Sequence, residues 1–239
     1  MATYAQVRET LARQLDVLVA GLEALDPAGP TDCEGWTVAD LDNHMAVNLR
    51  GLAAVEERRV DRAPTGGVLA WAGELEAFAA IADELARSTR FRTRDQVVAA
   101  LAALDAHAET TVVHQATGDH TLHDAAVFRV IEAVVHGLDV GITPDKKALR
   151  LVVKELTGLL AQRHPGKSVE VRVPPYSAVQ CVSGPRHTRG TPPNVVETDG
   201  VTFVRLAAGR ETWAHTVADG RVRASGERSD LSGLLPLIS

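Results

Sequence analysis

The stretch RVIEAVVHGLD, residues 129–139, places two ionisable side chains inside an apolar helical pattern. The pattern predicts a helix from about 121 to 140. Glu132 and His136 are four residues apart, so they lie about 40° apart on one face of that helix. Arg129 falls on the same face, one turn earlier. Because buried Glu and His side chains without partners would cost several kcal/mol, this face needs a partner group.

Two interpretations of this face remain open from spacing alone. In the first, Arg129 and Glu132 form an ion pair and His136 is hydrogen-bonded beside it. In the second, a divalent metal binds both side chains, since zinc accepts imidazole nitrogen and carboxylate oxygen. His44, on an earlier predicted helix with apolar neighbours, is the candidate third ligand. Three protein ligands leave one coordination position open, which is the pattern of catalytic rather than structural zinc sites.

The composition of the whole chain is that of a globular protein. The 239 residues are 45% hydrophobic and 23% charged, which excludes a disordered chain and allows one large or two small domains. The formal net charge of −6 argues against a nucleic-acid partner. No apolar run reaches the roughly 18–20 residues that span a bilayer, and the first residues lack the apolar core of a signal peptide. We therefore expect a cytoplasmic protein without a membrane span.

The chain divides into a helical part and a mixed part. Residues 1–145 carry apolar residues at helical spacing and are predicted to form a helical bundle. Residues 146–239 hold β-branched runs and most of the prolines and are predicted to form a small α+β domain, so the fold class is α+β. The expected helices cover about 3–25, 38–63 after a capping box at Thr37, 68–87, 93–115 from a capping box at Thr93, 121–140, 145–163, 201–208 and 211–218. The expected strands cover 168–173, 176–181 and 221–225.

Two motifs give the helical part a family resemblance. The segment CEGWTVADLDNHM, residues 33–45, resembles the opening motif of the mycothiol-dependent maleylpyruvate isomerase family, a branch of the DinB-like metal-binding helical bundles. The residues Arg129, Glu132, His136 and Asp139 match the family's second motif. The resemblance covers about residues 1–145. It implies a divalent metal, zinc, and the thiol mycothiol as cofactors, with His44, Glu132 and His136 as the metal ligands. We expect Arg129 to be a catalytic residue and Asp139 and Trp36 to bind the cofactor; the alternative for Arg129 and Asp139 is that they orient the metal ligands.

The second part of the chain resembles the bacterial sterol-carrier-protein-like domain. The resemblance rests on PYSAVQC at 175–181, GPRHTRGTPPNVVE at 184–197 and ASGERSDLS at 224–232. This version is closer to a group of actinobacterial proteins than to the isomerase's own C-terminal domain. Domains of this kind can enclose an apolar ligand, so an apolar partner is a second expectation.

These features predict a metal-dependent enzyme that uses a thiol. A free thiol has a pKa of about 8.5 and is mostly protonated at neutral pH, whereas a divalent metal deprotonates it. We expect the resulting metal-bound thiolate of mycothiol to attack a small electrophile, as an isomerase or an S-transferase. The alternatives are a non-catalytic carrier of an apolar ligand, a thiol or metal sensor, and a zinc hydrolase.

Several further residues have a structural and a functional interpretation. Trp36 precedes a predicted helix and could be a packing anchor instead of a cofactor contact. Cys33 and Cys181 are both predicted to be structural, with Cys181 buried in a strand. A polar loop follows the second strand, and its arginines suit a carboxylate or another anion, although a solvated loop is the alternative. The loop residues concerned are Arg186, His187, Arg189 and Asn194.

Overall fold

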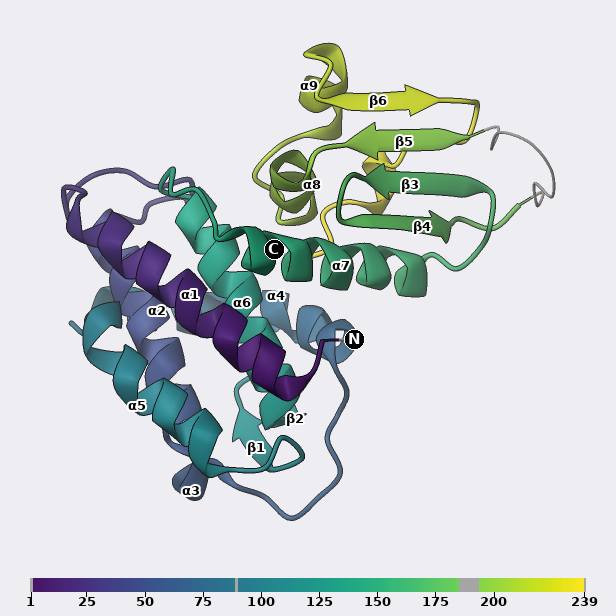
Figure 1. Cartoon of the computed structure of the whole chain (residues 1–239). Helices are drawn as coiled ribbons and strands as arrows, with labels where there is room; N and C mark the ends of the chain where they lie inside the picture. The colour runs from purple at the N-terminus through teal and green to yellow at the C-terminus, as the bar shows by residue number, and fades with distance from the viewer. Residues whose placement is uncertain (1, 89, 185–193, 239) are drawn as a thin grey trace. The chain divides into compact units, whose positions relative to one another are not determined.

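The computed structural model describes residues 2–88, 90–184 and 194–238. The chain separates into two compact units, Met1–Ala148 and Leu149–Ser239 (Figure 1). The first is mainly helical and the second combines helices with a four-stranded sheet, so the predicted α+β class is confirmed. The predicted division after residue 145 stays a prediction.

The first unit is a helical bundle built around one central helix. That helix, α6, buries twelve of its residues, and α1 and α2 both pack against it. Apolar residues of α1 recur at three- and four-residue spacing and are completely buried, which is how the amphipathic sequence joins the core. The elements are α1 (Tyr4–Glu23), α2 (Val38–Ala53), α3 (Val55–Arg58), α4 (Val68–Ser88), α5 (Thr93–Ala106), β1 (Val112–Gln115), β2 (Gly118–Thr121) and α6 (Leu122–Leu138).

The start of α2 is fixed by the predicted capping box. The Thr37 hydroxyl accepts a hydrogen bond from the Asp40 amide, and the Asp40 carboxylate accepts one from the Thr37 amide at 2.9 Å. Asp therefore replaces the usual Glu without loss of the reciprocal pair. The box satisfies two backbone amides and marks the start of α2.

Helix α2 also holds the connection between α4 and α5. The amide nitrogen of Asn43 donates to the carbonyls of Leu85 and Ala86 at 3.0 and 2.7 Å, which satisfies two acceptors at the end of α4. The carboxylate of Asp42 accepts a hydrogen bond from the backbone amide of Thr93, the first residue of α5, at 2.8 Å. Two neighbouring side chains of α2 thus hold helices α4 and α5.

Three predictions about this unit are wrong. The predicted second helix ends at Ala53 instead of before Pro64, and a single helical turn, α3, follows it. The predicted capping box at Thr93 is not formed, because the Thr93 hydroxyl donates to the Asp42 carbonyl and the N-cap position is Arg92. The predicted helix 93–115 ends at Ala106, and 112–115 is strand β1, paired with β2. The β-branched run 110–113 and the positive φ of Gly118 explain this hairpin.

The second unit is a mixed sheet covered by helices. The strand order is β4-β3-β5-β6, with β3 and β5 parallel and the other neighbours antiparallel. Strand β3 alternates as predicted, with Val169, Val171 and Val173 buried. Strand β5 was not predicted from the sequence. The elements are α7 (Lys146–Arg163, which begins in the first unit), β3 (Val169–Val173), β4 (Ser177–Cys181), β5 (Val195–Thr198), α8 (Gly200–Ala207), α9 (Trp213–Ala218), β6 (Val222–Ser225) and a 3₁₀ turn at Ser232–Leu234.

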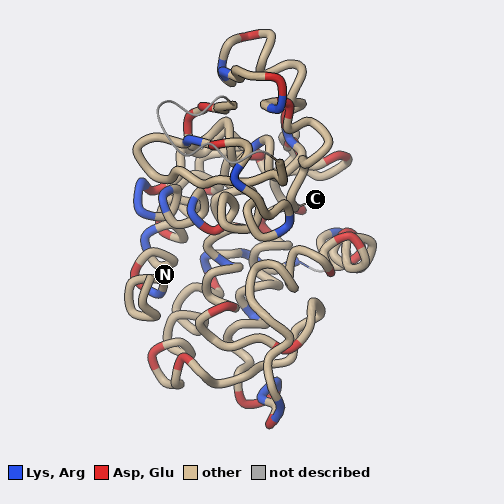
Figure 2. The backbone as a smooth tube through the Cα atoms, turned by 90° about the vertical axis from the view of Figure 1, so that its right-hand side faces the viewer, with Lys and Arg blue, Asp and Glu red and all other residues tan. Residues whose placement is uncertain are grey.

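Lys and Arg residues and Asp and Glu residues are both scattered along the backbone tube (Figure 2). Among the described residues, no helix is long and apolar enough to cross a membrane.

Candidate metal centre

Helices α2 and α6 bring the three predicted metal ligands together inside the first unit. The ring centroids of His44 and His136 are 4.9 Å apart, at an angle of 76°. The amide nitrogen of Asn48 lies 3.0 Å from Nε2 of His44 and 3.3 Å from Oε2 of Glu132. The two imidazoles therefore lie side by side, and Asn48 links the His44 ring to the Glu132 carboxylate.

Helical spacing accounts for this convergence. His44 and Asn48 are one turn apart on α2, and Glu132 and His136 are one turn apart on α6, so each pair projects from one helix face. The two helices pack against each other, and His44 and Asn48 of α2 contact His136 and Glu132 of α6. The spacing on α6 predicts that Glu132 and His136 lie on one face. The packing of α2 against α6 adds His44 and Asn48.

The ion-pair interpretation of the α6 face is also visible. Nη1 of Arg129 lies 3.0 Å from Oε2 of Glu132, and both side chains are nearly buried. Burial lowers the pKa of Arg129, and the negative charge of Glu132 opposes that shift. Nε of Arg129 is buried and has no hydrogen-bond partner among the described residues. Oε2 of Glu132 is thus ion-paired with Arg129 and accepts a hydrogen bond from Asn48, which fixes its carboxylate in place.

A second cluster lies against His136 and includes Cys33. The fully buried carboxylate of Asp139 accepts a hydrogen bond from Nδ1 of His136 at 3.0 Å. The same oxygen accepts one from the Cys33 thiol at 3.1 Å, and the sulfur lies 3.7 Å from Nδ1 of His136. Because Asp139 and Cys33 both approach Nδ1, the geometry differs from a Cys-His-Asp triad, in which the two groups use opposite ring nitrogens.

The two histidines have opposite electrostatic surroundings. Burial, followed by the positive charges of His136 and Arg129, lowers the pKa of His44 well below its ordinary value of 6.5. Burial also acts against the charged form of His136, but hydrogen bonds with Asp139 and Cys33 outweigh it and raise the pKa of His136 to about 9. His44 is therefore a neutral imidazole, and its Nε2 accepts a hydrogen bond from the Asn48 amide. Nδ1 of His136 donates a hydrogen bond to Asp139.

Trp36 lies beside both rings. Its ring centroid is 5.1 Å from that of His44 and 6.2 Å from that of His136, and it stacks on the latter at 25°. Its indole nitrogen donates to the Asp83 carboxylate of α4 at 2.7 Å. Both the packing role and a contact with a bound thiol fit this position.

Sequence reasoning missed three contributors to the site. Asn48 was detectable as the residue one turn after His44. Cys33 was detectable from its place in the same motif as Trp36, although we predicted it to be purely structural. Asp83 lies on α4 and no local pattern links it to the indole nitrogen of Trp36.

The donor types of the predicted ligands are those that zinc accepts, but the ligand atoms of His44, Glu132 and His136 do not all lie within 4.8 Å of one another; among the described residues the group that meets this distance is Cys33, His136 and Asp139. Nε2 of His44 and Oε2 of Glu132 both direct a lone pair at one donor, the Asn48 amide. A cation that binds there would meet a neutral imidazole and a carboxylate, the ligand types that zinc prefers. Nδ1 of His136 is engaged by Asp139, which leaves Nε2 as the nitrogen for a ligand; a carboxylate behind a histidine is the usual arrangement around protein-bound metals.

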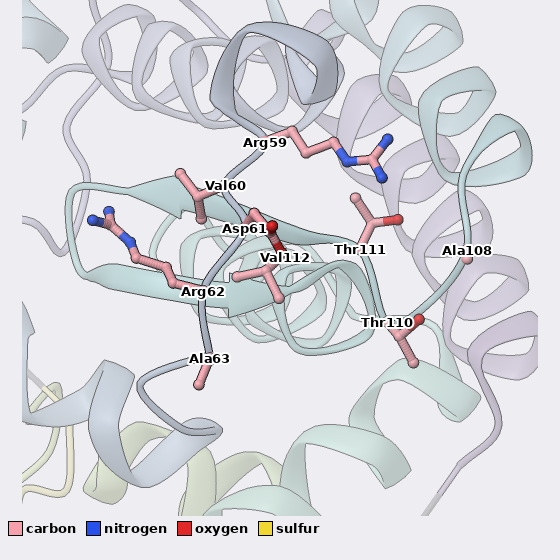
Figure 3. A pocket seen from close by; sticks show the side chains of 9 residues that line it. All are labelled: Arg59, Val60, Asp61, Arg62, Ala63, Ala108, Thr110, Thr111 and Val112. Carbon is pink, nitrogen blue, oxygen red and sulfur yellow. The ribbon is translucent and has the colours of Figure 1, made fainter.

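Two of the cavities lined by described residues lie outside this centre. Figure 3 shows a pocket of about 690 Å³ lined by 59–63, 108 and 110–112, with the side chains of Arg59 and Arg62 extending in opposite directions. Arg62 is paired with Asp119 at 3.0 Å, and no predicted site residue lines this pocket. In the second unit, a cavity between α7, α8 and the sheet has a volume of about 10 Å³, far below the roughly 300–1,000 Å³ of ligand pockets.

Of the four residues predicted as a polar loop site, the structure describes Asn194. Arg186, His187 and Arg189 lie outside the described residues. Asn194 is buried, donates to the Ser168 carbonyl at 2.8 Å and accepts from the Arg228 amide at 3.1 Å. Its contacts are those of a structural residue. Cys181 is completely buried in β4, as predicted, and burial raises the pKa of its thiol to about 11.

The fold and the site define a two-unit protein with a buried histidine–carboxylate centre in a helical bundle. A family model described as the mycothiol maleylpyruvate isomerase N-terminal domain matches residues 8–141, and one described as a bacterial SCP ortholog matches residues 145–237. The chain therefore belongs to the mycothiol maleylpyruvate isomerase family, a family of enzymes, and the resemblance predicted from the two motifs is confirmed.

Solved structures support the fold. Two crystal structures of the mycothiol-dependent maleylpyruvate isomerase, one of them a histidine-to-alanine mutant, resemble the chain with a TM-score of 0.58 each. Sequence identity is 19% for the mutant and 20% for the other structure, over 96% of this chain and 97% of theirs. No curated protein sequence matches the chain.

Proposed function

We propose that this chain is a metal-dependent isomerase or S-transferase that uses mycothiol to attack a small electrophile. The observation that carries the proposal is the convergence of His44 and Glu132 on the Asn48 amide, with the His136 ring beside them. Membership of the family supports the use of mycothiol. We propose His44, Glu132 and His136 as the ligands of the metal, with zinc as the ion.

A divalent metal held by these residues would supply the acidity that converts a thiol into a thiolate at neutral pH. The protein's own residues prepare the ligands. Asp139 holds His136 through Nδ1 and so fixes the orientation of its ring. Arg129 is ion-paired with Oε2 of Glu132, and Asn48 donates a hydrogen bond to the same oxygen. Because Arg129 is nearly buried, we assign it the positioning of Glu132 in preference to direct contact with the electrophile.

The isomerase version of the reaction regenerates the thiol. The thiolate sulfur adds to one carbon of a cis double bond and leaves a carbanion on the other. The former double bond is now a carbon–carbon single bond, so rotation about it becomes possible. Elimination of the thiolate restores the double bond in the trans geometry. An S-transferase would retain the carbon–sulfur bond and release a leaving group instead. Trp36 is our proposed contact for mycothiol; because the Asp139 carboxylate is completely buried, we assign it the positioning of His136 in preference to direct contact with the thiol.

The test combines zinc affinity with turnover. Single variants His44→Ala and Glu132→Gln should weaken zinc binding at least ~10–100-fold and abolish mycothiol-dependent isomerisation of maleylpyruvate, measured by absorbance. His123→Ala is the matched control, because His123 is on the same helix as Glu132 but bonds to the carbonyl of Ala2. Unchanged zinc affinity in both His44→Ala and Glu132→Gln would refute the ligand assignment. Turnover of a halide electrophile without isomerisation would favour the S-transferase.

The alternative of an apolar-ligand carrier has no comparable support. The cavity between α7, α8 and the sheet has a volume of about 10 Å³, which is room for about one water molecule.

A further inference from the structure

Cys33, His136 and Asp139 form a triangle of ligand atoms that the proposed reaction does not use. Sγ of Cys33, Nδ1 of His136 and Oδ2 of Asp139 are separated by 3.7, 3.1 and 3.0 Å. All three atoms lie within 4.8 Å of one another, and this is the group of His, Cys and acidic side chains that could hold a metal among the described residues. The three side chains come from the loop before α2 and from the end of α6.

The triangle has nearly the size of one face of a zinc tetrahedron. With metal–ligand lengths of about 2.3 Å to sulfur and about 2.0 Å to nitrogen and oxygen, the tetrahedral edges are about 3.5 Å to sulfur and about 3.3 Å between nitrogen and oxygen. The observed separations differ from these edges by less than about 0.5 Å. An ion could therefore cap this face with small side-chain movements, replacing the thiol proton and the proton on Nδ1.

We propose that Cys33, His136 and Asp139 form a second cation position, selective for soft divalent ions such as cadmium and for zinc in excess. Its ligands include a thiolate, which prefers softer ions than the two imidazoles and carboxylate of the first position. The thiol proton passes to the solvent on binding, as it does at other cysteine–metal sites. The fourth coordination position stays open for water or a thiol.

The two positions exclude each other. A neutral imidazole carries a lone pair on only one of its two ring nitrogens. The second position uses Nδ1 of His136, whereas the proposed catalytic position uses Nε2. An ion bound by Cys33 therefore removes His136 from the catalytic ligands, and a soft ion at this position would inhibit the enzyme. This consequence rests on the proposed function; the existence of the second position does not.

The test is ultraviolet absorption of the metal-free full-length protein titrated with cadmium. A thiolate-to-cadmium charge-transfer band should grow to one equivalent in the wild type and be absent in Cys33→Ser. Cys181→Ser is the matched control and should keep the whole band, because Cys181 is buried in β4 with a raised pKa. Asp139→Asn keeps the shape of the side chain and should weaken cadmium binding at least ~10-fold, which covers the case in which Cys33→Ser does not fold.

Glu132→Gln separates this proposal from the proposed function. It removes a ligand of the catalytic position only, so the cadmium band should persist or strengthen in this variant. Absence of the band from both the wild type and Glu132→Gln would overturn the second position, whatever the zinc affinity of the first. Persistence of the band in folded Cys33→Ser would overturn it as well. Failure of the proposed function would instead appear as unchanged zinc affinity of Glu132→Gln measured in a Cys33→Ser background.

Discussion

Replacing Asp139 with Asn should change how the stability of the metal-free protein depends on pH. In the wild type, Asp139 and Cys33 raise the pKa of His136 from 6.5 to about 9 despite its burial. At ~1.36 kcal/mol per pKa unit, that difference is worth about 3 kcal/mol of folding free energy. Because the folded-state pKa is the higher one, this contribution is complete below pH 6.5 and is lost as the pH rises through 9.

Asp139→Asn removes the negative charge but leaves the burial, which favours the neutral ring. The gap in free energy of unfolding between wild type and Asp139→Asn should therefore be largest near pH 6 and shrink by about 3 kcal/mol near pH 10. The assay is urea unfolding in the presence of a chelator across this range. Asp119→Asn is the control, since Asp119 also bonds a histidine, His114, but that ring is 59% exposed and such pairs contribute at most ~1 kcal/mol. Parallel stability curves for wild type and Asp139→Asn would refute the reasoning.

Single contacts elsewhere in the chain lead to three further predictions. Thr37→Ala removes the capping box of α2 and should lower the free energy of unfolding by ~1 kcal/mol, measured by denaturant titration; no loss would mean that tertiary packing alone fixes the start of the helix. Arg129→Met leaves the nearly buried Glu132 carboxylate without its cation and should cost ~3–5 kcal/mol in the metal-free protein, and equal stability of the two proteins would contradict a buried ion pair. In native protein, iodoacetamide should modify the partly exposed Cys33 well before Cys181, which is buried and has a pKa of about 11; peptide mass spectrometry locates the label, urea-unfolded protein is the control, and early labelling of Cys181 would disprove its burial.

The helices with strong apolar periodicity were predictable, because apolar residues spaced three and four apart indicate which face of a helix is buried. The α6 face shows this most clearly, since the spacing of Arg129, Glu132 and His136 already implied a shared environment. The hairpin at 112–121 was not predictable in the same way. An alanine-rich helix leads into it, and only the β-branched run and Gly118 mark the change.

The site could be predicted where two residues share a helix and could not where they come from distant segments. Cys33 and Asp139 are 106 residues apart, and Trp36 and Asp83 are 47 apart, so their contacts depend on how helices pack. At Thr93, a tertiary contact overrides a local sequence pattern. Its sequence context is that of a helix cap, but the nearby carbonyl of Asp42 offers its hydroxyl a different partner.

Asp42, Asn43 and His44 are consecutive on α2, and each contacts a different helix. Asp42 holds α5, Asn43 holds α4, and His44 faces α6. A one-residue insertion earlier in α2 would rotate all three by about 100° and break the three connections together. Evolution could therefore change the chemistry of this centre by substitution, but hardly by insertion or deletion within α2. Descendants of this sequence should vary in length in the loops while the interval from Trp36 to Asn48 keeps its number of residues.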